Sequence, residues 1–159
     1  MSIPSRLSIY LEQRGVPYEV CAHRHSHTSA QSARSARVAA HELAKSVIVE
    51  DDAGCVMAVV PADRRVRLGA LSQMLGREHL RLADEPRIAE LFGDCELGAV
   101  PALGMAWDVE TVVDDQLESS ARVYIEGGDH ERLLCLSHAQ FHALMSSARH
   151  GQFCAAPAH

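Results

Sequence analysis

The sequence has few aromatic residues, no long apolar run and almost no lysine. Phe, Trp and Tyr make up 4% of the 159 residues, so aliphatic side chains must supply most of a core. No stretch approaches the roughly eighteen consecutive apolar residues of a membrane-spanning helix, and the N-terminal residues lack the apolar stretch of a signal peptide. We therefore expect a cytoplasmic protein with no membrane partner.

Several sequence signatures of common functional classes are missing. The five cysteines are odd in number and no two are spaced as CxxC, which argues against a disulfide framework or a zinc knuckle. GxGxxG, Walker and GxSxG motifs are absent, so nucleotide-binding and serine hydrolase hypotheses are weak. The net charge of −6 argues against a protein that coats nucleic acid, and we expect no DNA partner. A small positive cleft on an acidic body is still compatible with this charge.

Helical and strand-like patterns alternate along the chain, which predicts an α/β or α+β domain. Asp51 to Gly54 separates two apolar runs and predicts a β-hairpin. We expect one domain over residues 1–150 and a disordered tail over 151–159. Helices are expected at 3–11, 28–40, 68–75, 85–92 and 138–149. Strands are expected at 16–22, 47–49, 55–60, 79–82, 109–113, 122–126 and 132–136.

Two positions are candidates for chemistry on local grounds. Lys45 is the only lysine in the chain and lies where a buried strand begins, so it is either a surface residue or a cation aimed into a cleft. The loop from Gly98 to Gly104 is rich in small residues. Such a loop is either an ordinary connection or a backbone that aims N–H groups at a carbonyl or phosphate oxygen.

Histidines and arginines supply further candidates. His130 follows a predicted hairpin turn, where it could position a water or simply be solvated. In a strand, alternate imidazoles of residues 23–27 would converge on a metal. Since no fourth ligand is evident, we favour a polar loop at the edge of a cleft and assign no metal or other cofactor. Arg64 and Arg65 lie in the densest basic cluster, which is either a solvated loop or a contact for a phosphate backbone.

Six segments, taken in order, resemble the YbaK/prolyl-tRNA synthetase-associated editing domain family. Each is only moderately specific, but their order and spacing are specific, and the resemblance covers roughly residues 5–145. The segments are HRHSHTS at 23–29, LAKSVIV at 43–49, VMAVVPADRRV at 56–66, CELGAVP at 95–101, TVVDD at 111–115 and VYIEGGDH at 123–130.

The resemblance implies a mixed, largely antiparallel sheet of about seven strands, curled toward a barrel and flanked by helices. It also implies a freestanding trans-editing deacylase that clears mischarged aminoacyl-tRNA by water attack on the ester. The substrate would be tRNA(Pro) carrying a small amino acid, and prolyl-tRNA synthetase is a candidate partner. A non-catalytic module that binds aminoacyl-tRNA or a small ligand is the alternative.

The family's functional residues transfer to particular positions of this chain. Its conserved lysine falls on Lys45, its GxxxP loop begins at Gly98, and the histidine near the cleft in some members is His130; these are the expected catalytic residues. The closing proline of GxxxP is Ala102 here, beside Pro101. Expected substrate contacts are Ser46, Ala99, Val100, Pro101, Ala102, His25 and Thr28. Expected tRNA contacts are Arg64 and Arg65.

Overall fold

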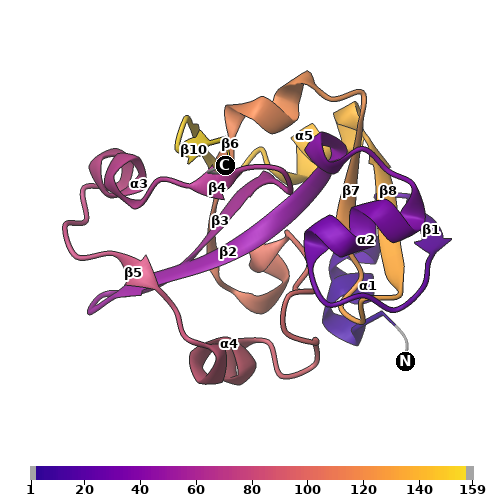
Figure 1. Ribbon diagram of the computed structural model, residues 1–159, viewed down its shortest axis with the longest axis horizontal. Coiled ribbons are helices and arrows are strands. Elements are labelled where there is room, and N and C mark those ends of the chain that lie inside the picture. The colour runs from indigo at the N-terminus through magenta and orange to yellow at the C-terminus, as the bar shows by residue number, and fades with distance from the viewer. Residues whose placement is uncertain (1–2, 157–159) are drawn as a thin grey trace.

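The computed structural model describes residues 3–156, which form a mixed α/β fold around one main sheet (Figure 1). The strands of this sheet are β1 (Glu19–Ala22), β2 (Leu43–Asp51), β3 (Gly54–Pro61), β5 (Arg81–Leu82), β6 (Glu110–Asp114), β7 (Arg122–Glu126), β8 (Arg132–Ser137) and β9 (Arg149–Gly151). A second, two-stranded sheet contains β4 (Arg65–Val66) and β10 (Cys154–Ala155). The α-helices are α1 (Ser5–Gln13), α2 (Ser29–Ala36), α3 (Leu68–Leu75), α4 (Glu85–Leu91) and α5 (His138–Leu144). Three 3₁₀ turns are η1 (Ala40–Glu42), η2 (Gly104–Trp107) and η3 (Asp115–Ser119).

The main sheet runs in the order β1-β8-β7-β2-β3-β6-β9, and β5 pairs with β2. The pairs β1–β8, β7–β8, β2–β3 and β2–β5 are antiparallel, whereas β2–β7, β3–β6 and β6–β9 are parallel. The expected mixed, largely antiparallel sheet flanked by helices is therefore confirmed. It stays open, with β1 and β9 at its two edges.

The β2–β3 hairpin is the one predicted from the sequence. Asp51 pairs with Gly54, whose φ of 135° suits a glycine in a tight turn. The Asp51 carboxylate accepts the Ala53 N–H at 2.8 Å and also binds the guanidinium of Arg77. The turn is thus fixed by a local side-chain contact and by a residue from beyond α3.

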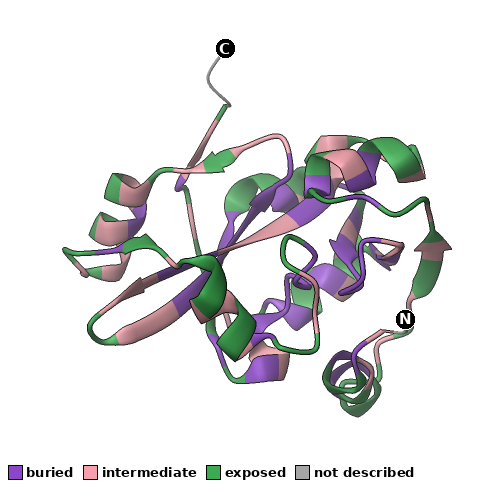
Figure 2. Cartoon of the chain, turned by 60° about the horizontal axis from the view of Figure 1, so that its bottom comes forward, coloured by how far each residue is buried: buried purple, intermediate pink, exposed green. Residues whose placement is uncertain are grey.

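Alternation of side chains along the strands divides the apolar core between the two faces of the sheet. Met57 and Val59 of β3 pack with residues of α1, η2 and α5 on one face. Val56 and Val60 pack with α3 on the other face, and α2 covers that face farther along, over β7 and β8 (Figure 1). Buried residues therefore follow the strands, while the outer sides of the helices are exposed (Figure 2).

The expected disordered tail is wrong for residues 151–156. Cys154 and Ala155 form β10, which pairs antiparallel with β4, and Phe153 is fully buried. The Phe153 N–H donates a hydrogen bond of 2.8 Å to the Asp114 carboxylate. Contacts with residues far away in the sequence order this segment. The segment is too short to carry a periodic apolar pattern that would predict these contacts. Residues 157–159 of the expected tail lie outside the described residues.

Other differences are smaller. The last helix ends at Leu144 rather than near residue 149, and the Ala-rich helix ends at Ala36, where Arg37 adopts φ 59°. All five cysteines are free. Within residues 3–156, no helix has the length and apolar character needed to cross a membrane.

Candidate functional site

The turn at Gly98 lies against two segments that carry histidines. Gly98 has φ +82°, and a Cβ added there would lie 2.8 Å from the His27 carbonyl oxygen and 3.2 Å from the His130 ring. Both the backbone conformation and the close approach therefore require glycine. The structure thus brings together three segments that the sequence separates: residues 23–28, residues 95–101 and the turn at 127–130.

His130 is a buried side chain that ties two of these segments together. Its Nε2 lies 2.6 Å from the Leu97 carbonyl oxygen, so the ring donates a hydrogen bond to the Gly98 loop. The residue is 2% exposed and adopts φ 58°, a left-handed conformation that is unusual outside glycine. Its Nδ1 is buried and makes no hydrogen bond within the described part of the chain. His130 is therefore not a solvated turn histidine.

His25 lies at the exposed side of the same cluster. Its Nε2 is 3.2 Å from Oε2 and 3.3 Å from Oε1 of Glu96. Its ring centroid lies 5.3 Å from that of His27 and 5.8 Å from that of His130. Sequence reasoning missed Glu96, although it is the acidic residue that comes two positions before Gly98.

The structure does not support convergence of three imidazoles from residues 23–27. The strand β1 ends at Ala22, so these residues form a loop, and His23 Nδ1 pairs with the neighbouring Arg24 carbonyl at 2.7 Å. Across residues 3–156, no group of three or more His, Cys, Asp or Glu side chains is arranged to hold a metal ion. Residues 23–27 form a loop that lies beside the Gly98 turn.

A small apolar cavity of about 240 Å³ lies between β2, α4 and the Gly98 loop. Ser46 Oγ donates a hydrogen bond of 2.9 Å to the Val100 carbonyl oxygen and so links the Gly98 loop to β2. The Ala99 N–H donates to the Glu96 carbonyl, whereas among residues 3–156 the N–H groups of Gly98 and Val100 donate no hydrogen bond. The cavity is lined by Ser46, Val47, Ile48, Leu82, Ala83, Ile88, Gly98 and Val100.

Other predicted substrate contacts have structural roles in this arrangement. Ala99, Pro101 and Ala102 are buried, and Ala102 is part of the main apolar core. The Thr28 hydroxyl oxygen accepts the Gln31 N–H at 3.1 Å and caps α2. The position that departs from the family motif, Ala102, therefore packs inside the protein rather than facing the cavity.

Lys45 is not among the residues that line this cavity, although its strand neighbours Ser46 and Val47 are. Side chains alternate along β2, and Lys45 shares a face with Leu43 and Val47, whereas Ser46 lies on the opposite face. Lys45 Nζ donates a hydrogen bond of 2.6 Å to the Arg64 carbonyl oxygen. Burial lowers the pKa of Lys45, and the nearby Asp63 carboxylate offsets part of this effect.

The predicted basic residues therefore form a second group beside Lys45. Arg64 is half-buried and lies 3.9 Å from the Asp63 carboxylate, while Arg65 is exposed on β4. The structure thus divides the predicted site residues into a set around Gly98 and a basic set on the other side of β2.

A buried carboxyl group lies beneath the turn that carries His130. Glu126 ends β7 and is 1% exposed, and neither carboxyl oxygen has a hydrogen-bond partner of standard geometry among the described residues. Burial raises the pKa of Glu126 to about 7; the hydroxyls of Ser32 and Ser29 lower it in part, and Asp129 raises it. No pattern in the sequence indicates a role for this group.

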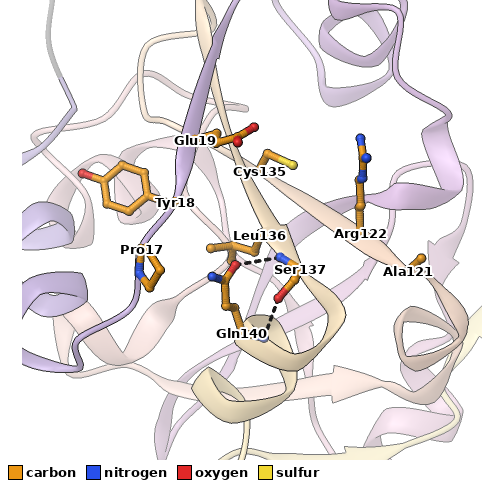
Figure 3. A pocket seen from close by; sticks show the side chains of 9 residues that line it. All are labelled: Pro17, Tyr18, Glu19, Ala121, Arg122, Cys135, Leu136, Ser137 and Gln140. Carbon is orange, nitrogen blue, oxygen red and sulfur yellow. Dashed lines mark hydrogen bonds between the residues drawn. The ribbon is translucent and has the colours of Figure 1, made fainter.

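Another cavity, of about 400 Å³, lies by β1, β8 and the start of α5 (Figure 3). Ser137 and Gln140 in its wall form the capping box of α5 and are therefore occupied with each other. None of the predicted site residues lines this cavity, so it is distinct from the site at Gly98.

Comparisons with known proteins agree with the fold. Residues 23–144 match the model of the family described as aminoacyl-tRNA editing domain. The crystal structure of hypothetical protein APE2540 superposes with a TM-score of 0.83 at 26% identity, covering 95% of this chain and 100% of that one. A candidate trans-editing enzyme for prolyl-tRNA synthetase superposes with a TM-score of 0.80 at 23% identity, covering 93% and 94%. A search of curated proteins finds no match.

Proposed function

Because this chain belongs to the aminoacyl-tRNA editing domain family, we propose that it is a trans-editing deacylase. It would hydrolyse the ester that joins a small amino acid to the 3′ end of a mischarged tRNA. The observation that carries this proposal is the aliphatic cavity lined by Gly98 and Val100, whose backbone N–H groups donate no hydrogen bond to any described residue.

The size of the cavity favours a small aminoacyl side chain. Its 240 Å³ lies below the roughly 300–1,000 Å³ typical of sites for drug-sized ligands. The lining is aliphatic apart from Ser46, whose hydroxyl already bonds to Val100. Such a pocket excludes larger side chains sterically but discriminates weakly among smaller ones, since one methylene is worth about 1–3 kcal/mol.

Hydrolysis would need little covalent chemistry from the protein, because an aminoacyl ester is already activated. The N–H groups of Gly98 and Val100 would stabilise the negative charge that develops on the carbonyl oxygen. The rest of the rate would come from holding the ester and a water in position.

The basic set on the other side of β2 would hold the tRNA. Lys45 binds the Arg64 carbonyl oxygen, and Arg65 is the next residue along the chain; the lysine would contact the terminal adenosine or its phosphate. We assign tRNA(Pro) as the substrate, with prolyl-tRNA synthetase as a partner. This assignment is supported by the fold shared with the candidate trans-editing enzyme.

Single-turnover deacylation of mischarged tRNAs tests the proposal. The panel would include Ala-, Cys- and Ser-tRNA(Pro), with correctly charged Pro-tRNA(Pro) as the substrate that should survive. We expect wild type to hydrolyse one or two members and Lys45→Ala to lose most of this activity. Catalytic turnover at sub-stoichiometric protein separates an enzyme from a binding module. Absence of hydrolysis across the panel, with tRNA binding intact, would favour the binding module.

A further inference from the structure

His130 is poorly placed to activate the water of a deacylation reaction. Its Nε2 is committed to the Leu97 carbonyl oxygen at 2.6 Å. Its Nδ1 is buried, so a water in the cavity beside Gly98 has no access to that lone pair. The role of this histidine is to hold the Gly98 turn, and the proton acceptor must be sought elsewhere.

His25 has the exposure and the partner that His130 lacks. Its side chain is 42% exposed, and its Nε2 lies within 3.3 Å of both carboxylate oxygens of Glu96. A carboxylate at Nε2 retains a proton on that nitrogen, which leaves the lone pair on Nδ1 free to accept one.

Glu96 is itself fixed by the loop that presents Gly98. Its N–H donates to the Gly128 carbonyl oxygen at 2.8 Å, and its carbonyl oxygen accepts the Ala99 N–H at 3.0 Å. The carboxylate, the imidazole and the free N–H of Gly98 are therefore held in one local framework. This arrangement matches a general base with an orienting group beside a site for a developing oxyanion.

We propose that His25 is the general base of the deacylation and that Glu96 positions its imidazole. The inference rests on the proposed function and adds a catalytic residue and a positioning residue to it. The other titratable side chains that contact the His25 ring are His27 and His130, both through edge-to-face contacts.

In this step, Nδ1 of His25 takes a proton from water as the water oxygen bonds to the ester carbonyl carbon. The π electrons of the carbonyl move onto its oxygen, which the Gly98 and Val100 N–H groups stabilise. The bond from this carbon to the ribose oxygen then breaks, and the imidazolium returns its proton to that oxygen. The products are the free amino acid and tRNA with a free hydroxyl, and no further reactant is needed.

His25→Ala and Glu96→Gln test the assignment in the full chain. General-base catalysis contributes about 10²–10⁴-fold, so His25→Ala should lower single-turnover deacylation by at least about 100-fold. Added imidazole should restore part of the lost rate in His25→Ala, because a small base can occupy the vacated space. A merely structural role of His25 would give no such rescue. His79→Ala, which changes an exposed histidine that does not line the cavity, is the matched control and should retain the wild-type rate.

The pH profile supplies the second readout. Wild-type rates should fall on acidification, as the base becomes protonated, and His25→Ala should lack this fall. Glu96→Gln should lower kcat and shift the pH at which the rate falls on the acidic side. KM should change little, since the carboxylate acts through His25. Hydrolysis by wild type together with an unchanged rate in His25→Ala would overturn the role of His25 and leave the proposed function standing. Absence of hydrolysis by wild type would instead overturn the proposed function itself.

Discussion

Nε2 of His130 donates a hydrogen bond of 2.6 Å to the carbonyl oxygen of Leu97, and this contact joins the β7–β8 turn to the Gly98 loop. The two residues are separated by β6 and β7, so the contact exists only in the folded chain. His130 makes it from a left-handed backbone conformation, which costs free energy for a non-glycine residue. The hydrogen bond to Leu97 and the unfavourable backbone conformation of His130 together indicate that the position of the Gly98 turn matters for function.

Two substitutions of His130 separate the effect of its hydrogen bond to Leu97 from the effect of its left-handed backbone conformation. His130→Ala removes the hydrogen bond, worth about 1 kcal/mol, and keeps the strained backbone, whereas His130→Gly removes both. We expect both variants to lose at least about tenfold in deacylation rate, with His130→Gly the more stable of the two in thermal unfolding. A wild-type rate in either variant would contradict the tethering role.

Gly98→Ala should damage the site directly. A Cβ at this position meets the His27 carbonyl oxygen at 2.8 Å, and the φ of +82° is unfavourable for alanine. We expect a loss of about 100-fold in deacylation, measured under single-turnover conditions, because a shift of about 1 Å in a catalytic group can cost that much. Gly69→Ala is the matched control. Gly69 lies in α3 with nothing within 4 Å of its added Cβ, so this change should leave the rate unchanged and stabilise the helix slightly.

The sequence was sufficient to predict the fold because local and long-range signals agree in this chain. The Asp51 to Gly54 turn occurs where the local pattern predicts it, and the helices expected at 68–75 and 85–92 are α3 and α4, which end before Gly76 and begin after the Asp84 cap. The ordering of Phe153 was not predictable, since it depends on the Asp114 carboxylate from a distant strand.

The site was predictable only in part. Gly98, a predicted catalytic residue, and Ser46, a predicted substrate contact, line one cavity, whereas Lys45 does not line it and binds the Arg64 carbonyl oxygen instead. Side-chain alternation predicts that neighbouring residues of a strand face opposite ways, and a motif match does not take this into account. Glu96 and Glu126 were missed, because a carboxyl group acquires its role from partners or burial that only the fold supplies.

Truncating the cavity wall should broaden the range of amino acids removed. Ile88 of α4 lines the cavity, so Ile88→Ala would add space for several carbon atoms. We expect mischarged tRNAs with larger side chains to be hydrolysed about 10–100-fold faster than by wild type, as measured across the substrate panel. Ile9→Ala makes the same chemical change at an exposed position of α1 and should leave the selectivity unaltered. An identical selectivity profile for Ile88→Ala and wild type would exclude this cavity as the aminoacyl pocket.

Arg65 should contribute to tRNA affinity rather than to the chemical step. It is exposed on β4, next to the Arg64 segment that binds Lys45. We expect Arg65→Ala to weaken tRNA binding and to reduce the slope of log affinity against log salt by about one, with little change in kcat. Binding titrations at several salt concentrations measure both quantities. Arg14→Ala, at the end of α1, serves as the control for a change in net charge alone; an equal effect of both variants would remove the basic set from the proposed interface.

Glu126 should make the stability of the protein depend on pH. Its pKa is raised from 4.5 to about 7 in the folded state, so the folded protein holds a proton that the unfolded chain has already released above pH 4.5. Stability from this group is therefore complete below pH 4.5 and is lost as pH rises toward 7, by roughly 3 kcal/mol.

Glu126→Gln removes the titrating group while keeping its shape. The variant should be more stable than wild type at pH 8, by up to about 3 kcal/mol, and about equally stable near pH 4. Urea unfolding across this range measures the difference, and Glu12→Gln on the exposed side of α1 should show no such trend. A constant difference between Glu126→Gln and wild type at all pH values would mean that the carboxyl group does not titrate near neutral pH. A difference in stability between the two proteins that grows between pH 4.5 and 7 would show that folded wild type holds a proton on Glu126. Because Glu126 lies beneath the turn of His130, loss of this proton would also loosen the Gly98 site.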